Sequence, residues 1–233
     1  DTAKIYGNEE GVGRAIAETG IPREELFVTT KLWDDAHAFD DAIAACEASL
    51  ERLGLDYVDL YLIHWAVPSQ GQYVEAWKAL IALQERGLVR AIGVSNFPKE
   101  QLAEIIEATG VAPAIHQIEL HPYFQQRELR GIHEEKGILT ESWGPLGQGK
   151  SDLLENPAVT AIAEAHEASP AQVVLAWHLA HGIVTIPKSV TPSRIVENLA
   201  AVELELTADE IAAIDALDRE DGRGGADPAT KTT

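Results

Sequence analysis

The sequence predicts an α/β protein built as a (β/α)8 TIM barrel. Strand-like apolar segments alternate with amphipathic segments along nearly the whole chain of 233 residues. Strict alternation with short connections favours a parallel sheet covered by helices. An open doubly wound sheet is the alternative, but the glycine-rich stretch at 144–149 reads GPLGQG and does not match its G-x-G-x-x-G signature. The length suits one domain, so we expect a single domain over residues 1–233.

The strand-like segment at 56–65, DYVDLYLIHW, anchors this interpretation. Its nearly continuous apolar run, with aromatic and β-branched residues, is typical of a strand buried on both faces. The run ends in His64 and Trp65. Ligands bind at the carboxyl ends of parallel strands, so His64 is a candidate for chemistry. A histidine that only caps the strand is the alternative when His64 is considered alone.

The other strands are predicted from short apolar runs that end close to polar residues. We expect them at 26–32, 89–94, 114–120, 139–143 and 183–186, with 1–6 as the tail of another strand.

The helices are predicted from apolar residues at spacings of three and four and from their end signals. Ile43, Cys46 and Leu50 show this spacing, and Gly54 follows as a stop. Thr207 and Glu210 form a capping box. We expect helices at 8–18, 38–53, 72–86, 98–109, 125–136, 157–167, 170–181, 191–200 and 207–217, and a loop from Asp218 to the end.

Composition narrows the function classes. The net charge of −20, from 38 acidic and 18 basic residues, disfavours binding to nucleic acid or to an anionic membrane. Cys46 is the only cysteine, which excludes an intramolecular disulfide, argues against structural zinc and fits a reducing compartment such as the cytoplasm. We expect no bound metal.

Four residues near predicted strand ends suit proton transfer. They are Asp1, Tyr6, Lys31 and His64. A tyrosine titrates near pH 10 in water, and a nearby ammonium group lowers that pKa, while a carboxylate keeps the lysine protonated. His64 would then hydrogen-bond a substrate oxygen. An ordinary Asp–Lys ion pair with a packing tyrosine is the alternative.

Several motifs together resemble the aldo-keto reductase family. They are DTAxxYGNE from Asp1, TKLW from Thr30, DLYLIHW from Asp59, GVSNF from Gly93, QIELHP from Gln117 and IPKS from Ile186. ESWGPLGQGK from Glu141 is similar to the prokaryotic 2,5-diketo-D-gluconate reductase branch. The resemblance implies a barrel whose N-terminal hairpin, first βα unit and most of the second strand belong ahead of Asp1, so we expect the barrel here to lack them.

The resemblance also implies a function. We expect NADPH-dependent reduction of aldehydes and ketones, whether small carbonyls, α-dicarbonyls or keto-sugars, by a monomer. Asp1, Tyr6, Lys31 and His64 would be the catalytic tetrad, with Tyr6 as the proton donor. Trp33 and Trp65 would line the substrate pocket.

The cofactor residues follow from the same resemblance. Trp143 would stack on the nicotinamide, whose carboxamide would be held by Ser95, Asn96 and Gln117. The pyrophosphate would lie against Gly144, Leu146 and Gly147. The 2′-phosphate and the adenine would be held by Lys188, Ser189, Arg194, Glu197 and Asn198. Because Lys188 and Arg194 are suited to a phosphate, we expect a preference for NADPH over NADH.

Two other function classes compete with this one. A binding or regulatory protein could keep the cofactor without turnover, but the intact tetrad argues against it. A lyase or isomerase could use the amine of Lys31 as a Schiff base, but the residues Trp143 and 188–198 favour a cofactor enzyme.

Overall fold

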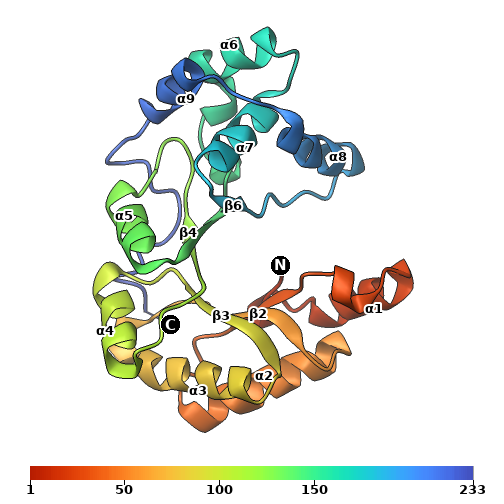
Figure 1. The fold of residues 1–233 in the computed structure, drawn as a ribbon, viewed down its shortest axis with the longest axis vertical. Helices are drawn as coiled ribbons and strands as arrows, with labels where there is room; N and C mark the ends of the chain where they lie inside the picture. Colours follow the sequence, from red (N-terminus) through yellow and green to blue (C-terminus); the bar gives the residue numbers. More distant parts are fainter. Residues whose placement is uncertain (233) are drawn as a thin grey trace. The chain divides into compact units, whose positions relative to one another are not determined.

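The computed structural model describes residues 1–232 (Figure 1). Contacts within the chain divide it into two compact units. Unit 1 comprises residues 1–116 and the C-terminal stretch from Asp227, and unit 2 comprises residues 117–226. The expectation of one domain over residues 1–233 remains a prediction.

Unit 1 contains three parallel strands. They are β1 (Thr29–Leu32), β2 (Val58–Ile63) and β3 (Val89–Ser95), and β2 pairs with both of the others. All six residues of β2 are buried, which confirms the prediction of a strand covered on both faces. The register places Lys31 of β1 opposite Leu62 of β2, close to the carboxyl ends of both strands.

The first strand begins three residues later than predicted. The carbonyl oxygen of Leu26 accepts a hydrogen bond from Arg23 (2.8 Å), and the N–H of Val28 donates to the carboxylate of Asp59 (2.9 Å). Side chains thus satisfy backbone groups that a sheet ladder would otherwise use, and β1 starts at Thr29.

The helices of unit 1 form where the periodicity predicts. They are α1 (Glu9–Thr19), α2 (Phe39–Leu53), α3 (Tyr73–Glu85) and α4 (Lys99–Thr109), with 3-10 turns η1 (Lys4–Tyr6), η2 (Arg23–Glu25) and η3 (Pro68–Gln70). α2 packs against α1 and α3, and α3 covers β2 and β3 (Figure 1). The α1–α2 approach is close: a Cβ added to Gly13 would lie 2.3 Å from the carbonyl oxygen of Leu53.

Unit 2 continues the alternation. Its strands are β4 (Ile115–Glu119), which leads out of unit 1, β5 (Leu139–Trp143) and the short β6 (Val184–Thr185). β5 and β6 are parallel. The predicted strand at 183–186 is one residue shorter at each end, although the N–H of Ile186 still donates to the carbonyl oxygen of Ser142 (3.3 Å).

Five helices and three 3-10 turns complete the described part of unit 2. They are α5 (Arg127–Lys136), α6 (Pro157–Ala165), α7 (Pro170–Ala180), α8 (Pro192–Ala200) and α9 (Ala208–Asp215), with η4 (Gly147–Gly149), η5 (Leu153–Glu155) and η6 (Ala201–Glu203). The capping box is confirmed, since Thr207 and Glu210 exchange hydrogen bonds of 3.3 and 2.8 Å. The core of this unit includes Ile118, Tyr123 and Trp177.

The six strands follow one another in the sheet in chain order, from β1 to β6, with helices between successive strands. This alternating, parallel arrangement agrees with the barrel-like α/β fold that the sequence predicts. The expectation that further barrel elements belong ahead of Asp1 remains a prediction.

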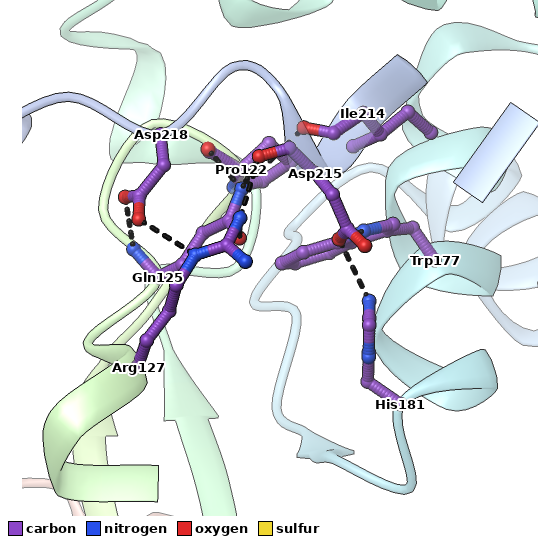
Figure 2. Close-up of polar contacts among 8 residues, drawn as sticks. All are labelled: Pro122, Gln125, Arg127, Trp177, His181, Ile214, Asp215 and Asp218. Atoms are coloured by element: carbon purple, nitrogen blue, oxygen red, sulfur yellow. Dashed lines mark hydrogen bonds and ion pairs between the residues drawn. The ribbon is translucent and has the colours of Figure 1, made fainter. Parts of the chain in front are cut away.

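A hydrogen-bond network fastens the end of α9 to the loop before α5 (Figure 2). Arg127 donates to the carbonyl oxygen of Asp215 (2.7 Å) and to the carboxylate of Asp218 (3.1 Å). Gln125 donates to the same two residues, through its side chain to Asp215 (3.1 Å) and through its backbone N–H to Asp218 (3.0 Å). The network fixes where the C-terminal tail leaves the last helix.

The tail then stays close to unit 2 up to Gly225. A Cβ on Gly222 would lie 1.8 Å from the carbonyl oxygen of Tyr123, so only glycine fits there. The carboxylate of Glu119 accepts hydrogen bonds from the N–H groups of Gly224 (2.7 Å) and Gly225 (2.9 Å). Burial acts to raise the pKa of Glu119, but these bonds and His121 outweigh it and lower the pKa, which favours the ionised form. The predicted loop is confirmed for residues 218–232, and Thr233 lies outside the described residues.

Candidate active site

Lys31 and Asp1 form a buried ion pair. Lys31 lies near the carboxyl end of β1, its side chain is fully buried, and its Nζ lies 2.6 Å from Oδ1 of Asp1. Nζ also donates to the carbonyl oxygen of Thr2 (3.0 Å). A lysine held this way keeps its charge, because a carboxylate and a carbonyl oxygen replace the lost water.

Tyr6 lies beside this pair and beside His64. The 3-10 turn η1 carries Tyr6, and Lys31 Nζ is 5.4 Å from the centroid of the phenol ring. The ring meets the imidazole of His64 edge-on, with centroids 5.7 Å apart. Unit 1 therefore brings Asp1, Tyr6, Lys31 and His64 together, as the sequence predicts.

The pKa of Tyr6 departs from its ordinary value in the direction opposite to the expected one. Desolvation by burial raises the pKa of the Tyr6 phenol. The charge of Lys31 is already compensated by Asp1, which limits its effect on the phenol. A raised pKa keeps the Tyr6 hydroxyl protonated at neutral pH.

His64 follows the end of β2 and is buried among aromatic rings. Its imidazole lies 5.2 Å from the ring of Trp33 and 6.3 Å from that of Trp65, between centroids. Burial, and then the charges of Lys31 and Lys231, lower the pKa of His64 to about 3. The imidazole is therefore neutral at neutral pH. Within residues 1–232 its buried Nδ1 has no hydrogen-bond partner.

Trp33 and Trp65, the two predicted substrate residues, flank His64 and are half-buried. A third residue, Lys231, joins them: its Nζ lies 5.2 Å from the ring centroid of each tryptophan. Lys231 also pairs with Asp34 at 2.6 Å. The sequence gives no signal for this contact, because Lys231 lies in the predicted loop, 197 residues from Asp34.

Ser95 is the last residue of β3 and Asn96 follows it, and both are buried. Asn96 adopts a left-handed conformation with φ of 55°, and its side-chain amide donates to the carbonyl oxygen of His64 (3.1 Å) and to Ser95 Oγ (2.9 Å). These bonds connect the ends of β2 and β3.

The remaining predicted cofactor residues lie in unit 2. Gln117 of β4 is buried and donates to Glu141 of β5 (3.3 Å). Trp143 ends β5, and its ring lies so close to Gly225 that a Cβ there would approach it to 2.5 Å. Leu146 packs on the core of unit 2.

The loop after β5 carries two of the predicted cofactor residues, Gly144 and Gly147, in the left-handed conformation. Gly144 and Gly147 have φ values of 62° and 70°, which favour glycine. A Cβ at Gly147 would meet Ser151 Oγ at 2.8 Å. A Cβ at Gly144 would come within 3.2 Å of the Gln148 side chain, and Gly147 is buried, so side chains of the loop itself pack against both glycines.

The second group of predicted cofactor residues in unit 2 surrounds the start of α8. Lys188 follows β6 and Arg194 lies in the first turns of α8, and both are exposed. Among the residues that the structure describes, neither makes an ion pair. Ser189 bonds to the backbone of Thr191 (3.1 Å). Glu197 and Asn198 are half-buried on α8. Two uncompensated cations fit a phosphate group of a cofactor.

No group of three or more His, Cys, Asp or Glu side chains within residues 1–232 could hold a metal ion. No helix in this range is long and apolar enough to cross a membrane.

Comparison with known proteins agrees with these features. The model of the Aldo/keto reductase family matches residues 1–219. An "Aldo-keto reductase" of Mycolicibacterium vanbaalenii is 56% identical over 232 residues, which is 100% of this chain and 82% of that protein. "Methylglyoxal reductase DkgA" of Salmonella typhimurium is 50% identical over 228 residues, covering 98% of this chain and 82% of that protein.

Solved structures are equally similar. A variant of Gox0644 crystallised in complex with NADPH has a TM-score of 0.94 and 51% identity, covering 99% of this chain and 83% of that one. A protein provisionally named 2,5-diketo-D-gluconic acid reductase B has a TM-score of 0.92 and 37% identity, covering 97% of this chain and 80% of that one. The chain is a member of the aldo/keto reductase family of oxidoreductases.

Proposed function

We propose that the protein reduces aldehydes and ketones to alcohols with NADPH, acting on small carbonyls, α-dicarbonyls or keto-sugars. The observation that carries this proposal is the cluster of Tyr6, His64 and the Lys31–Asp1 ion pair. The name of a relative 50% identical, a methylglyoxal reductase, supports the carbonyl class.

Tyr6 and Lys31 have different roles in proton transfer. Tyr6 is the proton donor to the oxygen of the substrate, and its raised pKa keeps that proton in place until the oxygen becomes basic. The Lys31 ammonium group, fixed by Asp1, stabilises the negative charge left on the phenol oxygen. NADPH, when bound, supplies the hydride for the carbonyl carbon.

His64 positions the carbonyl. A neutral imidazole has one N–H and can donate it to the substrate oxygen without competing as an acid. Trp33 and Trp65 line the substrate pocket around it.

We propose that NADPH is held by all of the cofactor residues that the sequence predicts. Ser95, Asn96 and Gln117 bind the carboxamide, Trp143 stacks on the nicotinamide, and Gly144, Leu146 and Gly147 bind the pyrophosphate. The 2′-phosphate and adenine contact Lys188, Ser189, Arg194, Glu197 and Asn198. The NADPH complex of a relative 51% identical supports this choice of cofactor.

We propose that the protein is a monomer, that it works in the cytoplasm and that its only partner is a small-molecule substrate. The single, buried Cys46 suits a reducing compartment, and the net charge of −20 disfavours nucleic acid and anionic membranes as partners.

A Schiff-base enzyme fits the geometry less well. Lys31 Nζ is fully buried and engaged with Asp1 and the backbone of Thr2, which favours the ammonium form over a nucleophilic amine. Borohydride trapping with substrate tests this alternative, and covalent labelling of Lys31 would support it.

The direct test is an assay of the purified protein with methylglyoxal or propanal. We expect consumption of NADPH together with formation of an equal amount of the alcohol. Consumption of NADPH without alcohol, or no consumption with either carbonyl, would refute the proposed function.

A further inference from the structure

The C-terminal tail brings a lysine to the substrate side of the candidate active site. Lys231 pairs with Asp34 at 2.6 Å, and the exposed fractions of the two side chains are 14% and 1%. Asp34 follows Trp33 after the end of β1, and all three residues belong to unit 1. A nearly buried ion pair holds Lys231 in one place, unlike a lysine on an open surface.

Lys231 faces the two tryptophan rings, Trp33 and Trp65. Its ammonium group lies 5.2 Å from each of the two indole centroids, a cation–π distance. The same two indoles flank His64. Its charge also lowers the pKa values of His64 and His37, although burial is the main cause at both residues. Lys231 is therefore close to the position where His64 would hold a carbonyl oxygen.

The surroundings of Lys231 contain buried polar atoms that have no partner. Among the described residues these are Oδ1 of Asp34, both ring nitrogens of His37, and Nδ1 of His64. Buried polar atoms are nearly always hydrogen-bonded in native proteins, so a group of unpaired ones indicates a place for a polar ligand or ordered water. Asp34 and His37 are 2% and 1% exposed, so these atoms face inward.

The charge balance defines which ligand atoms fit. An ammonium group has three donors, and Asp34 accepts one of them. The Asp34 carboxylate also compensates the charge of Lys231, and the chain as a whole carries a net charge of −20. A neutral oxygen acceptor can use a remaining donor of Lys231, whereas a carboxylate would be repelled by Asp34.

We propose that Lys231 is a specificity-determining residue that donates a hydrogen bond to a neutral oxygen on the carbon next to the reacting carbonyl. The site would then select α-dicarbonyl and α-hydroxycarbonyl compounds over simple aldehydes. This inference rests on the proposed reductase function and adds a residue to it that lies outside the predicted tetrad and cofactor set.

The test uses three substrates with three carbons each: propanal, methylglyoxal and pyruvate. They carry, next to the reacting carbonyl, no oxygen, a neutral oxygen and a carboxylate, respectively. In Lys231→Met we expect kcat/KM for methylglyoxal to fall about tenfold, mainly through KM, because a hydrogen bond from a charged donor is lost. The value for propanal should stay within about twofold of wild type.

Two further variants separate a local role from a general loss of structure. Lys78→Met removes one exposed charge from the same unit, where Lys78 pairs with Glu75 on α3, and should leave the methylglyoxal-to-propanal ratio unchanged. Asp34→Asn keeps the size of the side chain and removes the compensating charge, so it should raise the activity on pyruvate relative to methylglyoxal.

The outcomes are distinct. Equal losses for propanal and methylglyoxal in Lys231→Met, no loss for either, or a wild-type preference for pyruvate over methylglyoxal would each overturn the assignment of Lys231. If wild type reduces neither propanal nor methylglyoxal with NADPH, the proposed function itself fails. If wild type reduces both but Lys231→Met does not change the ratio, only this inference fails.

Discussion

The fully buried ammonium group of Lys31, near the carboxyl end of β1, lies 2.6 Å from a carboxylate oxygen of Asp1. The pair lies beside the Tyr6 ring and supplies the fixed positive charge of the site. Lys31 is buried by the strand, while Asp1 reaches it from the loop that precedes η1. The geometry makes the charge of Lys31 dependent on Asp1.

The first prediction concerns this pair. Asp1→Asn should lower kcat about 10²-fold or more, because Lys31 loses its counter-ion and tends to release its proton, so the charge that stabilises the Tyr6 oxygen disappears. Steady-state rates with methylglyoxal measure the effect. Glu75→Gln, which removes a carboxylate from an exposed ion pair in the same unit, is the control and should keep the wild-type rate. A variant Asp1→Asn with normal kcat would show that the ion pair is only structural.

The second prediction concerns the effect of acid on stability. Burial lowers the pKa of His37, His133 and His178 to about 4 and that of His64 to about 3. The unfolded chain takes up these protons as the pH falls through about 6.5, but the folded chain does not until about pH 4. Unfolding therefore binds protons, and the free energy of unfolding should fall as the pH drops from about 7 to about 4.

Urea unfolding at several pH values measures this slope. His133→Gln keeps a polar partner for Thr140, which lies 2.8 Å from the ring Nδ1, and removes one titrating group. Between pH 6.5 and about pH 4, its free energy of unfolding should depend less on pH than that of wild type, by about 1.4 kcal/mol per pH unit. Identical slopes for the two proteins would contradict the assignment for His133.

A third prediction compares two glycines inside helices. A Cβ added to Gly13 of α1 would lie 2.3 Å from the carbonyl oxygen of Leu53. A Cβ added to Gly131 of α5 would meet no neighbouring group within 4 Å. Gly131→Ala should stabilise the protein by about 0.5–1 kcal/mol, because alanine is the better helix former. Gly13→Ala should destabilise it, because α1 and α2 must separate. Chemical denaturation distinguishes the two, and a shift of the same sign in both variants would show that close packing at Gly13 is not decisive.

The sequence predicts most of the fold because the information is local. The continuous apolar run of β2, the helix periodicity around Cys46 and the capping box at Thr207 all specify their elements within a few residues. The late start of β1 could not be predicted, because it depends on Arg23 and Asp59, 36 residues apart in sequence, binding the same stretch of backbone.

The sequence likewise predicts part of the candidate site and misses the rest. The ends of β1 and β2 and the motif around Tyr6 indicate the four clustered residues, and the structure brings them together. The predicted direction of the Tyr6 pKa shift was wrong, because the sequence does not show how strongly the phenol is desolvated. Lys231 could not be found from sequence at all, since it lies in a predicted loop and its partner Asp34 is 197 residues away.

The fourth prediction concerns the choice between NADPH and NADH. Lys188 and Arg194 are exposed cations that make no ion pair within residues 1–232. A 2′-phosphate could therefore form an ion pair with each of them. Arg194→Leu should weaken NADPH binding by about tenfold or more and leave NADH binding nearly unchanged. Titration of tryptophan fluorescence with each cofactor measures both affinities. Equal affinities of wild type for NADPH and NADH would refute the role of these cations.

The central claim is that Tyr6 donates the proton in carbonyl reduction, and Tyr6→Phe tests it most directly. Phenylalanine keeps the ring that meets His64 and removes only the hydroxyl. We expect kcat and kcat/KM for methylglyoxal to fall together by about 10²–10⁴, because the interaction develops in the transition state, while NADPH affinity stays close to wild type. His64→Gln should lose less, because His64 only orients the carbonyl.

The measurement is the rate of NADPH consumption by Tyr6→Phe at saturating methylglyoxal, alongside a fluorescence titration that confirms cofactor binding. A protein that binds NADPH normally and has lost its turnover is the predicted result. Wild-type turnover in Tyr6→Phe would contradict the account, because the proton would then come from another group.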